Sequence, residues 1–219
     1  MNRGFAQSIA AIVATATLSC AAHAGDGDLS ANVRLLNAAR AGDVAAVERC
    51  LKEGASPDSR TRIGETALVM ALKKNDLATA RAMIAAGTDV NIPAVNGITA
   101  LMAAAYNGEL EMVQALLARG ADVSAIDRLG KNAMTYAAGQ GHTAVVHALL
   151  AKGVDANAVY KNDLTALMWA AGYGRDETVK LLLEAGARTD LRDNRGKTAE
   201  DIAREGGYAR TVTLLERGK

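Results

Sequence analysis

The sequence predicts an all-helical solenoid built from about six helix-turn-helix repeats. Alanine recurs every 33 residues from Ala38 to Ala203, and glycine keeps the same step from Gly54 to Gly186. Half of the 219 residues are apolar, yet only 3% are aromatic and two are proline, a composition that favours close-packed helices over a β-sandwich. Because independent positions keep one period over most of the chain, the repeat is a specific signal.

Residues 1–24 are interpreted as a signal peptide. Arg3 supplies a positive charge, residues 9–18 form a short apolar stretch, and Ala22-His23-Ala24 has the small-x-small pattern of a cleavage site. We therefore expect a bacterial protein that is secreted across the inner membrane into the periplasm. Its mature chain would be the repeat domain of residues 25–219.

An uncleaved membrane anchor is the alternative, although the apolar stretch is short and rich in Ala and Thr for a membrane span. Lipid attachment at Cys20 is disfavoured, because Thr17 stands where a large aliphatic residue is expected. Without Cys20 the mature chain keeps one cysteine, Cys50, which cannot form an internal disulfide. Cys50 falls at a repeat position that Met83 and Leu116 fill elsewhere, so we expect a buried hydrophobe rather than a reactive thiol.

Residues 95–127 illustrate the expected order of elements in one repeat. A turn at Gly97 precedes Thr99, whose side-chain oxygen is placed to cap the first helix. The small Ala104 lets that helix lie close to its neighbour, and Gly108 separates it from a second helix with apolar residues at helical spacing. A closing glycine then permits the left-handed conformation that ends a helix. The same order predicts repeats at about residues 29–60, 61–94, 95–127, 128–160, 161–193 and 194–219.

These positions together resemble the repeat of the ankyrin family. The family pattern of turn glycine, Thr-Pro-Leu-His, Ala-Ala, Gly, Val, Leu-Leu and Gly-Ala is matched by residues 97–104, 108, 113, 116–117 and 120–121. The resemblance covers about residues 29–219 and implies an all-α ankyrin-repeat solenoid whose repeats carry β-turn or hairpin fingers. Alanine replaces the proline of the pattern, several residues replace its histidine, and Asp163 takes one turn-glycine position. These departures do not change the predicted fold.

The sequence carries no catalytic constellation. Gly196-Lys197-Thr198 resembles the end of a phosphate loop, but Leu191 stands where that motif needs glycine. His142 and His147 are five residues apart, a spacing that does not place two metal ligands on one helical face. We therefore predict a protein that is not an enzyme, holds no metal and needs no cofactor.

The resemblance implies that partners bind at the finger tips and along the exposed edge of the first helix, which together line a concave face. Nine basic residues occupy these positions against two acids, Glu65 and Glu205, which leaves +7 on this face. Once Arg3 is removed, the mature chain has 24 basic and 24 acidic residues, so about −7 must lie elsewhere. Trp169 is expected to belong to the core. The predicted partner-binding residues are Arg62, Lys73, Lys74, Asn96, Tyr106, Asn107, Arg128, Lys131, Lys161, Tyr173 and Arg195.

We interpret the chain as a non-catalytic protein-interaction module of the bacterial cell envelope that binds an acidic partner surface through a basic concave face. Aromatic and aliphatic residues stand among the cations of this face, which is typical of protein-binding surfaces. Two alternatives stay open: the cations only solubilise the protein, or they dock on anionic lipid or glycolipid headgroups at a membrane surface. The charge balance predicts no binding to nucleic acid, and the oligomeric state stays open.

Overall fold

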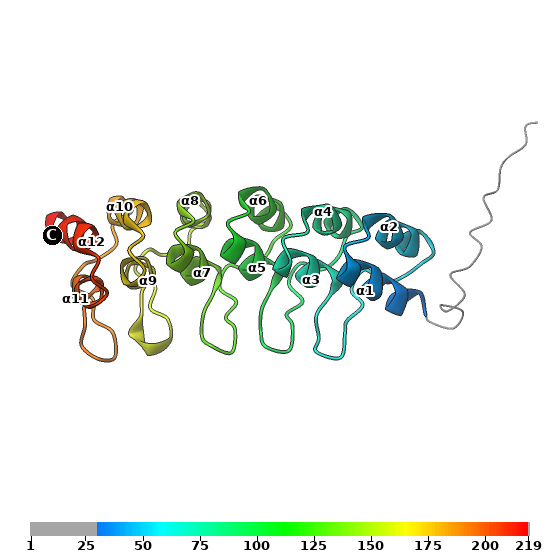
Figure 1. Cartoon of the computed structure of the whole chain (residues 1–219), viewed down its shortest axis with the longest axis horizontal. Coiled ribbons are helices and arrows are strands. Elements are labelled where there is room, and N and C mark those ends of the chain that lie inside the picture. Colours follow the sequence, from blue (N-terminus) through cyan, green and yellow to red (C-terminus); the bar gives the residue numbers. More distant parts are fainter. Residues whose placement is uncertain (1–29, 219) are drawn as a thin grey trace, which may run out of the picture.

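A computed structural model describes residues 30–218, which form twelve α-helices in six consecutive pairs (Figure 1). The first helices of the pairs are α1 (Ala31–Ala41), α3 (Ala67–Lys73), α5 (Ala100–Asn107), α7 (Ala133–Gln140), α9 (Ala166–Gly172) and α11 (Ala199–Glu205). The second helices are α2 (Val44–Lys52), α4 (Leu77–Ala85), α6 (Leu110–Ala118), α8 (Thr143–Ala151), α10 (Asp176–Glu184) and α12 (Ala209–Arg217). The pairs stand side by side in chain order, so the first helices make one row and the second helices another.

This arrangement confirms the predicted all-α solenoid. Within the described residues no strand forms, apart from an isolated β-bridge between Arg60 and Thr66. No helix in this part of the chain is long and apolar enough to cross a bilayer. The predicted signal peptide, residues 1–24, lies outside the described residues.

The first helices begin where the sequence places a capping residue. The Thr99 hydroxyl accepts a hydrogen bond from the backbone N–H of Met102 at 3.3 Å. Thr66, Thr165 and Thr198 cap α3, α9 and α11 in the same way. Such a cap satisfies one of the N–H groups that a helix start leaves without an intrahelical partner. The prediction of these four caps is confirmed.

At two positions where the ankyrin pattern has histidine, this chain has a residue that forms a reciprocal capping box with the N-cap residue. At α7 the backbone N–H of Asn132 donates to the hydroxyl of Thr135 at 2.9 Å, while the Asn132 side chain accepts from the Thr135 N–H. At α11 the backbone N–H of Thr198 donates to the Asp201 carboxylate at 3.0 Å. The replacement residues therefore satisfy helix-terminal donors locally.

Small residues let successive first helices pack closely. Ala104, Ala137 and Ala170 have no solvent-exposed surface, and Leu116 is fully buried in the same core. Cys50 is buried in the same core, and burial raises the pKa of its thiol. The expectation of a buried hydrophobe at Cys50 therefore holds.

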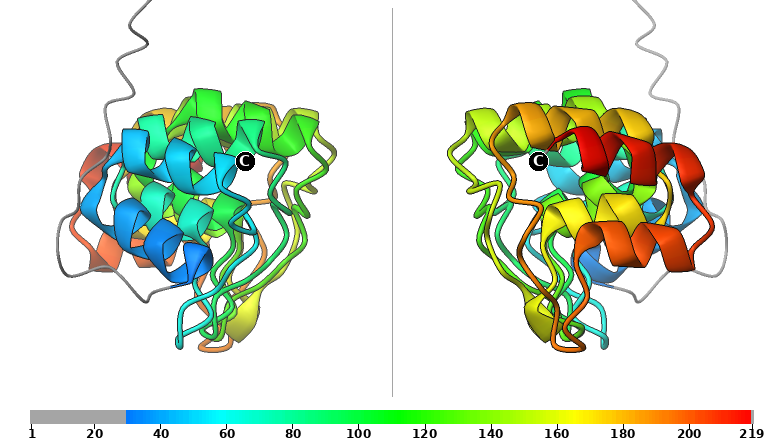
Figure 2. Two further views of the ribbon diagram at one scale, coloured as in Figure 1. Left: turned by 90° about the vertical axis from the view of Figure 1, so that its right-hand side faces the viewer. Right: turned by 90° about the vertical axis from the view of Figure 1, so that its left-hand side faces the viewer.

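Five fingers project from the joints between successive helix pairs (Figure 2). They comprise residues 61–65, 94–98, 127–131, 160–164 and 193–197. The same two backbone hydrogen bonds close each of them. In the second finger the N–H of Ala94 donates to the carbonyl of Ile98 at 2.9 Å, and the N–H of Gly97 donates to the carbonyl of Ala94 at 2.8 Å. Gly97 has a φ of 84°, a left-handed conformation that favours glycine.

Backbone hydrogen bonds also link neighbouring fingers, as in the donation from the N–H of Arg128 to the carbonyl of Asn96 at 3.0 Å. The fourth finger has a different tip, because Asn162 and Asp163 both adopt positive φ, 63° and 58°. They form the short 3-10 turn η1 (Lys161–Asp163). Asn and Asp tolerate this conformation better than other non-glycine residues, so Asp163 can occupy a turn-glycine position.

Candidate partner-binding surface

The fingers and the adjoining edge of the first-helix row border one side of the solenoid, which we call the inner face (Figure 2). Nine of the eleven predicted binding residues are exposed there, and Lys131 and Asn107 are half-buried. The fingers carry Arg62, Asn96, Arg128, Lys131, Lys161 and Arg195. The C-terminal ends of α3, α5 and α9 carry Lys73, Lys74, Tyr106, Asn107 and Tyr173.

Four aromatic rings on α5, α7 and α9 follow the inner face as an aromatic track, made of Tyr106, Tyr136, Trp169 and Tyr173. The ring centroids of Tyr106 and Tyr136 are 5.8 Å apart at an interplanar angle of 83°. Trp169 and Tyr173 stack at 6.2 Å and 11°. Lys131 joins the two pairs, because its Nζ lies 5.5 Å from the Tyr136 centroid and 4.4 Å from that of Trp169. The electron-rich ring faces attract the ammonium and hold it between two repeats.

Reasoning from the sequence misses Tyr136 and Trp169. Trp169, expected in the core, is half-buried: it packs against the core and also stacks on the exposed Tyr173. Two sequence signals point to this role. Tyr136 and Trp169 occupy the same position in consecutive repeats, and Trp169 and Tyr173 are four residues apart, which places them on one helical face.

Tyr136 is fixed by a buried carboxylate in the third finger. Its hydroxyl donates to Oδ2 of Asp127 at 2.5 Å, and Oδ1 of Asp127 accepts from the backbone N–H groups of Leu129 and Lys131. Burial, together with the hydrogen bond and charge of Asp127, raises the pKa of Tyr136 well above its usual value. Tyr136 therefore stays a neutral donor, and its ring keeps one orientation in the track.

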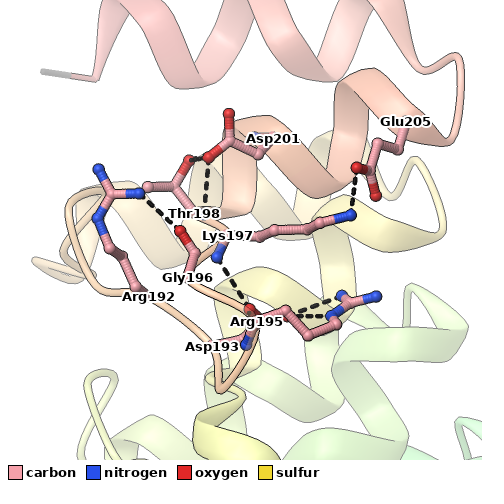
Figure 3. A network of polar contacts seen from close by, with 8 residues as sticks. All are labelled: Arg192, Asp193, Arg195, Gly196, Lys197, Thr198, Asp201 and Glu205. Atoms are coloured by element: carbon pink, nitrogen blue, oxygen red, sulfur yellow. Dashed lines mark hydrogen bonds and ion pairs between the residues drawn. The ribbon is translucent and has the colours of Figure 1, made fainter.

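The fifth finger holds its charges in a closed network (Figure 3). Nε and Nη2 of Arg195 donate to Oδ2 of Asp193 at 2.9 and 2.7 Å, and the backbone N–H groups of Arg195 and Lys197 donate to Oδ1. Although burial opposes it, these hydrogen bonds hold the pKa of Asp193 below its usual value. The ammonium of Lys197 pairs with Glu205. The predicted binding residue Arg195 thus already has a carboxylate partner.

Two cations at the C-terminal end of α3, beside the first finger, also have partners within the molecule. Nζ of Lys73 pairs with Oε1 of Glu65 at 2.5 Å. The ammonium of Lys74 donates to the backbone carbonyl of Arg40. Counting these cations as freely available overstates the charge that a partner would meet.

Two predicted contact residues support the scaffold. Oδ1 of Asn96 accepts from the backbone N–H of Ile98 at 3.2 Å, within the second finger. Nδ2 of Asn107 donates to the carbonyl of Leu72 at 2.6 Å, which ties α5 to α3. Both side chains therefore have a structural role whether or not a partner contacts them.

The residues weighed for catalysis take structural positions. Gly196 forms a finger turn with a φ of 77°, and Thr198 caps α11. His142 precedes α8, with Nε2 2.9 Å from the carbonyl oxygen of Tyr106, and His147 is exposed. Throughout the described part of the chain, no group of three His, Cys, Asp or Glu residues could hold a metal ion.

Paired helices with projecting, turn-closed fingers define a class of repeat solenoids. The sequence matches the family described as Ankyrin repeats (3 copies) over residues 35–127, 86–160 and 134–219. The chain therefore belongs to the ankyrin-repeat family. Ankyrin repeats generally mediate protein–protein interaction, and their fold is typically a non-catalytic scaffold for protein partners.

Two solved structures are similar to most of the chain. The ankyrin repeat protein EF0377 is 32% identical with a TM-score of 0.77, over 85% of this chain and 98% of that one. An ankyrin repeat domain from Acinetobacter baumannii AYE is 33% identical with a TM-score of 0.75, over 84% of this chain and 96% of that one. A comparison with curated proteins gives no match.

Proposed function

We propose that this chain is a non-catalytic binding module of the bacterial cell envelope that engages an acidic protein surface through its inner face. The observation that carries the proposal is the juxtaposition of unpaired cations with exposed rings. Among the described residues, Arg128 and Lys161 make no ion pair; Arg128 shares the third finger with the half-buried Lys131, and Lys161 lies on the fourth finger. Tyr106 and Tyr173 are each 50% exposed beside them. Aromatic residues and arginine are the types enriched at protein interfaces.

The proposed basic character of the inner face includes the finger stems as well as the tips. The stems add Arg60 and Arg192 to the nine cations already counted. They also add Asp127 and Asp193 to the two acids Glu65 and Glu205, and the turn of the fourth finger adds Asp163. Eleven cations against five carboxylates leave +6. Three of these cations, Lys73, Arg195 and Lys197, are ion-paired. Arg62 on the first finger and Arg128 and Lys161 at the centre are exposed and make no ion pair with the described residues, so they carry the charge open to a partner.

Capture of a partner from periplasmic extract, followed by binding kinetics at two salt concentrations, tests the proposal. The double variant Arg128→Glu with Lys161→Glu should slow association and weaken its salt dependence, because exposed cations mainly steer encounter. Tyr106→Ala should speed dissociation and cost about 2 kcal/mol or more of binding free energy, the range of an anchor residue.

A matched control makes the same charge change on the second-helix row. Arg119 and Lys152 are exposed at the C-terminal ends of α6 and α8, and neither makes an ion pair within residues 30–218. Arg119→Glu with Lys152→Glu should leave binding unchanged. If this control abolishes binding while the inner-face variants do not, the partner binds the opposite side and the proposal fails.

Docking on anionic lipid or glycolipid headgroups uses the same cations and is the second candidate. Headgroups suit a flat, purely cationic surface, whereas the centre of the inner face carries aromatic rings. Vesicles rich in phosphatidylglycerol should therefore not sediment the protein at physiological salt. Sedimentation that depends on Arg128 and Lys161 would favour the lipid instead.

The envelope location is part of the proposal and is supported by the pattern of Arg3, the apolar stretch of residues 9–18 and Ala22-His23-Ala24. The protein purified from the envelope fraction should begin at Gly25 by mass spectrometry. Finding soluble cytoplasmic protein with Met1 intact would contradict this location.

A further inference from the structure

Two small apolar hollows lie along the aromatic track. The Tyr106 hollow has about 220 Å³ and is lined by Lys73, Ile98, Met102, Ala103, Tyr106 and Tyr136, among others. The Trp169 hollow has about 200 Å³ and is lined by Met168, Trp169, Gly172, Tyr173, Arg195 and Ile202, among others. Both are smaller than the clefts of ~300–1,000 Å³ that take drug-sized ligands. Each therefore matches a single apolar side chain.

Small residues at repeat positions that carry rings elsewhere leave room for both hollows. Ala103 stands where Tyr136 and Trp169 stand in the next two repeats, and Gly172 stands where Tyr106 stands two repeats earlier. Gly172 lies within α9 and does not have a positive φ, so the backbone does not require glycine there. The hollows thus follow from the choice of side chains on an otherwise regular scaffold.

The stretch between the hollows is cationic. Lys131 lies over the ring of Trp169, and Arg128 and Lys161 stand unpaired on the third and fourth fingers. Of the carboxylates on these two fingers, Asp127 is buried, and only Asp163 is exposed. A chain that runs from one hollow to the other therefore crosses three cations and one exposed carboxylate.

We infer that one extended, acidic segment of the partner binds along the track, with an apolar side chain in each hollow and carboxylates between them. The inference rests on the proposed function and specifies the chemistry of the partner. The hollows centre on α5 and α9, two helix-to-helix steps apart, which is roughly 16–20 Å at ~8–10 Å per step. An extended chain rises ~3.3 Å per residue and alternates its side chains, so anchors about six positions apart face the same side.

Selection of random peptides about sixteen residues long displayed on phage, with the purified full chain as target, tests the inference without a known partner. The enriched peptides should carry two apolar residues about six positions apart, with at least two Asp or Glu residues between them. A helical segment would need its anchors roughly twelve positions apart, because a helix rises only ~1.5 Å per residue. Enrichment of that spacing would overturn the extended form.

Variants then assign each anchor to its hollow. Tyr106→Ala and Tyr173→Ala each remove one wall of a hollow, and both should weaken an enriched peptide at least tenfold. When one apolar residue of the peptide is replaced by alanine, its affinity should no longer depend on the tyrosine of the hollow that this residue fills. The affinity should still fall with the variant at the other hollow, and replacing the other apolar residue should reverse this pattern. Ile126→Ala is the matched control, because Ile126 is 61% exposed and lines neither hollow. It should leave the affinity unchanged.

The inference is overturned if no peptide is enriched, if enriched peptides lack acidic residues, or if neither tyrosine variant weakens them. These outcomes are separable from a failure of the proposed function. If one of these outcomes occurs but a captured partner still loses affinity with Arg128→Glu and Lys161→Glu, the proposed basic inner face is supported and only the two-anchor segment is excluded.

Discussion

In the first and fifth fingers, the residue after the turn glycine pairs with the residue eight positions later, whereas the fingers between them use these positions differently. Glu65 pairs with Lys73 at 2.5 Å, and Lys197 pairs with Glu205, so the two ends of the inner face carry the same ion pair with its charges exchanged. In the intervening fingers the two positions hold Ile98 and Tyr106, Lys131 and Gly139, and Leu164 and Gly172. None of these three combinations can form an ion pair.

The difference shows how a repeat changes its surface while keeping its backbone. Lys131 and Lys197 occupy the same position in fingers closed by equivalent hydrogen bonds. Lys197 finds Glu205 in its own repeat, whereas Gly139 leaves Lys131 without that carboxylate, and the ammonium lies over Trp169 of the next repeat. At this position the first and fifth fingers therefore find a charge partner within their own repeat, whereas Lys131 of the third finger reaches the next repeat.

The largest expected effect tests a difference in packing between fingers. The second finger packs against the third, whereas the fifth finger has no following finger in the described chain to pack against. A Cβ added to Gly97 would lie 2.8 Å from the Cα of Asp127 in the next finger, whereas one added to Gly196 would meet nothing within 4 Å. Both glycines have positive φ, so Gly97→Ala and Gly196→Ala should each cost about 1–2 kcal/mol of unfolding free energy from backbone strain. Gly97→Ala should cost roughly 1–3 kcal/mol more through overpacking.

Urea unfolding of the two variants and the wild type measures this difference. Gly196→Ala is the matched control, because it introduces the same methyl group at the same repeat position. Equal losses of stability in the two variants would mean that the second and third fingers do not press against each other as described.

The fold could be predicted from the sequence because each repeat carries its own local signals. Thr99 caps α5, Gly108 ends it with a φ of 78°, and Ala104 is buried against the neighbouring helices. Each of these roles depends on residues within one repeat or at the same position of the next. A constant period of 33 residues therefore conveys them without knowledge of the three-dimensional structure.

The candidate site could be predicted only in outline. The position of a residue in the repeat predicts whether it reaches the inner face, but not which other residue it pairs with there. Lys131 and Trp169 are 38 residues apart, and Gly139 offers Lys131 no carboxylate of the kind that Glu205 offers Lys197. From the sequence, Arg195 is an available cation. In the structure it forms an ion pair with Asp193, whose side chain is only 1% exposed. Such pairings depend on rotamer and burial, which a count of charges does not include.

The second-largest expected effect tests the partners of two buried carboxylates that occupy the same position in the third and fifth fingers. Asp193 in the fifth finger is held by the guanidinium of Arg195, whereas Asp127 in the third finger has the hydroxyl of Tyr136 instead. Tyr136→Phe removes that donor and should lower the unfolding free energy by about 1.5–3 kcal/mol, the range for a hydrogen bond to a charged group.

Tyr106→Phe is the control for this change, because the Tyr106 hydroxyl makes no hydrogen bond to the described residues and half of the side chain is exposed. Its effect on thermal or urea unfolding should stay within about 0.5 kcal/mol. If the two variants unfold alike, the hydroxyl of Tyr136 does not stabilise the third finger.

The smallest expected effect tests whether the two end pairs are equivalent. Lys197→Glu or Glu205→Lys alone places like charges together and should cost at most about 1 kcal/mol, because exposed ion pairs contribute only ~0.2–1 kcal/mol. The double variant reproduces the arrangement of Glu65 and Lys73, so it should recover most of that loss. The recovery should shrink in high salt, which screens exposed charges. Lys161→Glu is the control: with no ion pair to lose, its effect on stability should change far less with salt. A double variant as unstable as the sum of its single changes would show that Lys197 and Glu205 are not coupled, and the contrast between self-paired ends and an unpaired centre would then rest on the first finger alone.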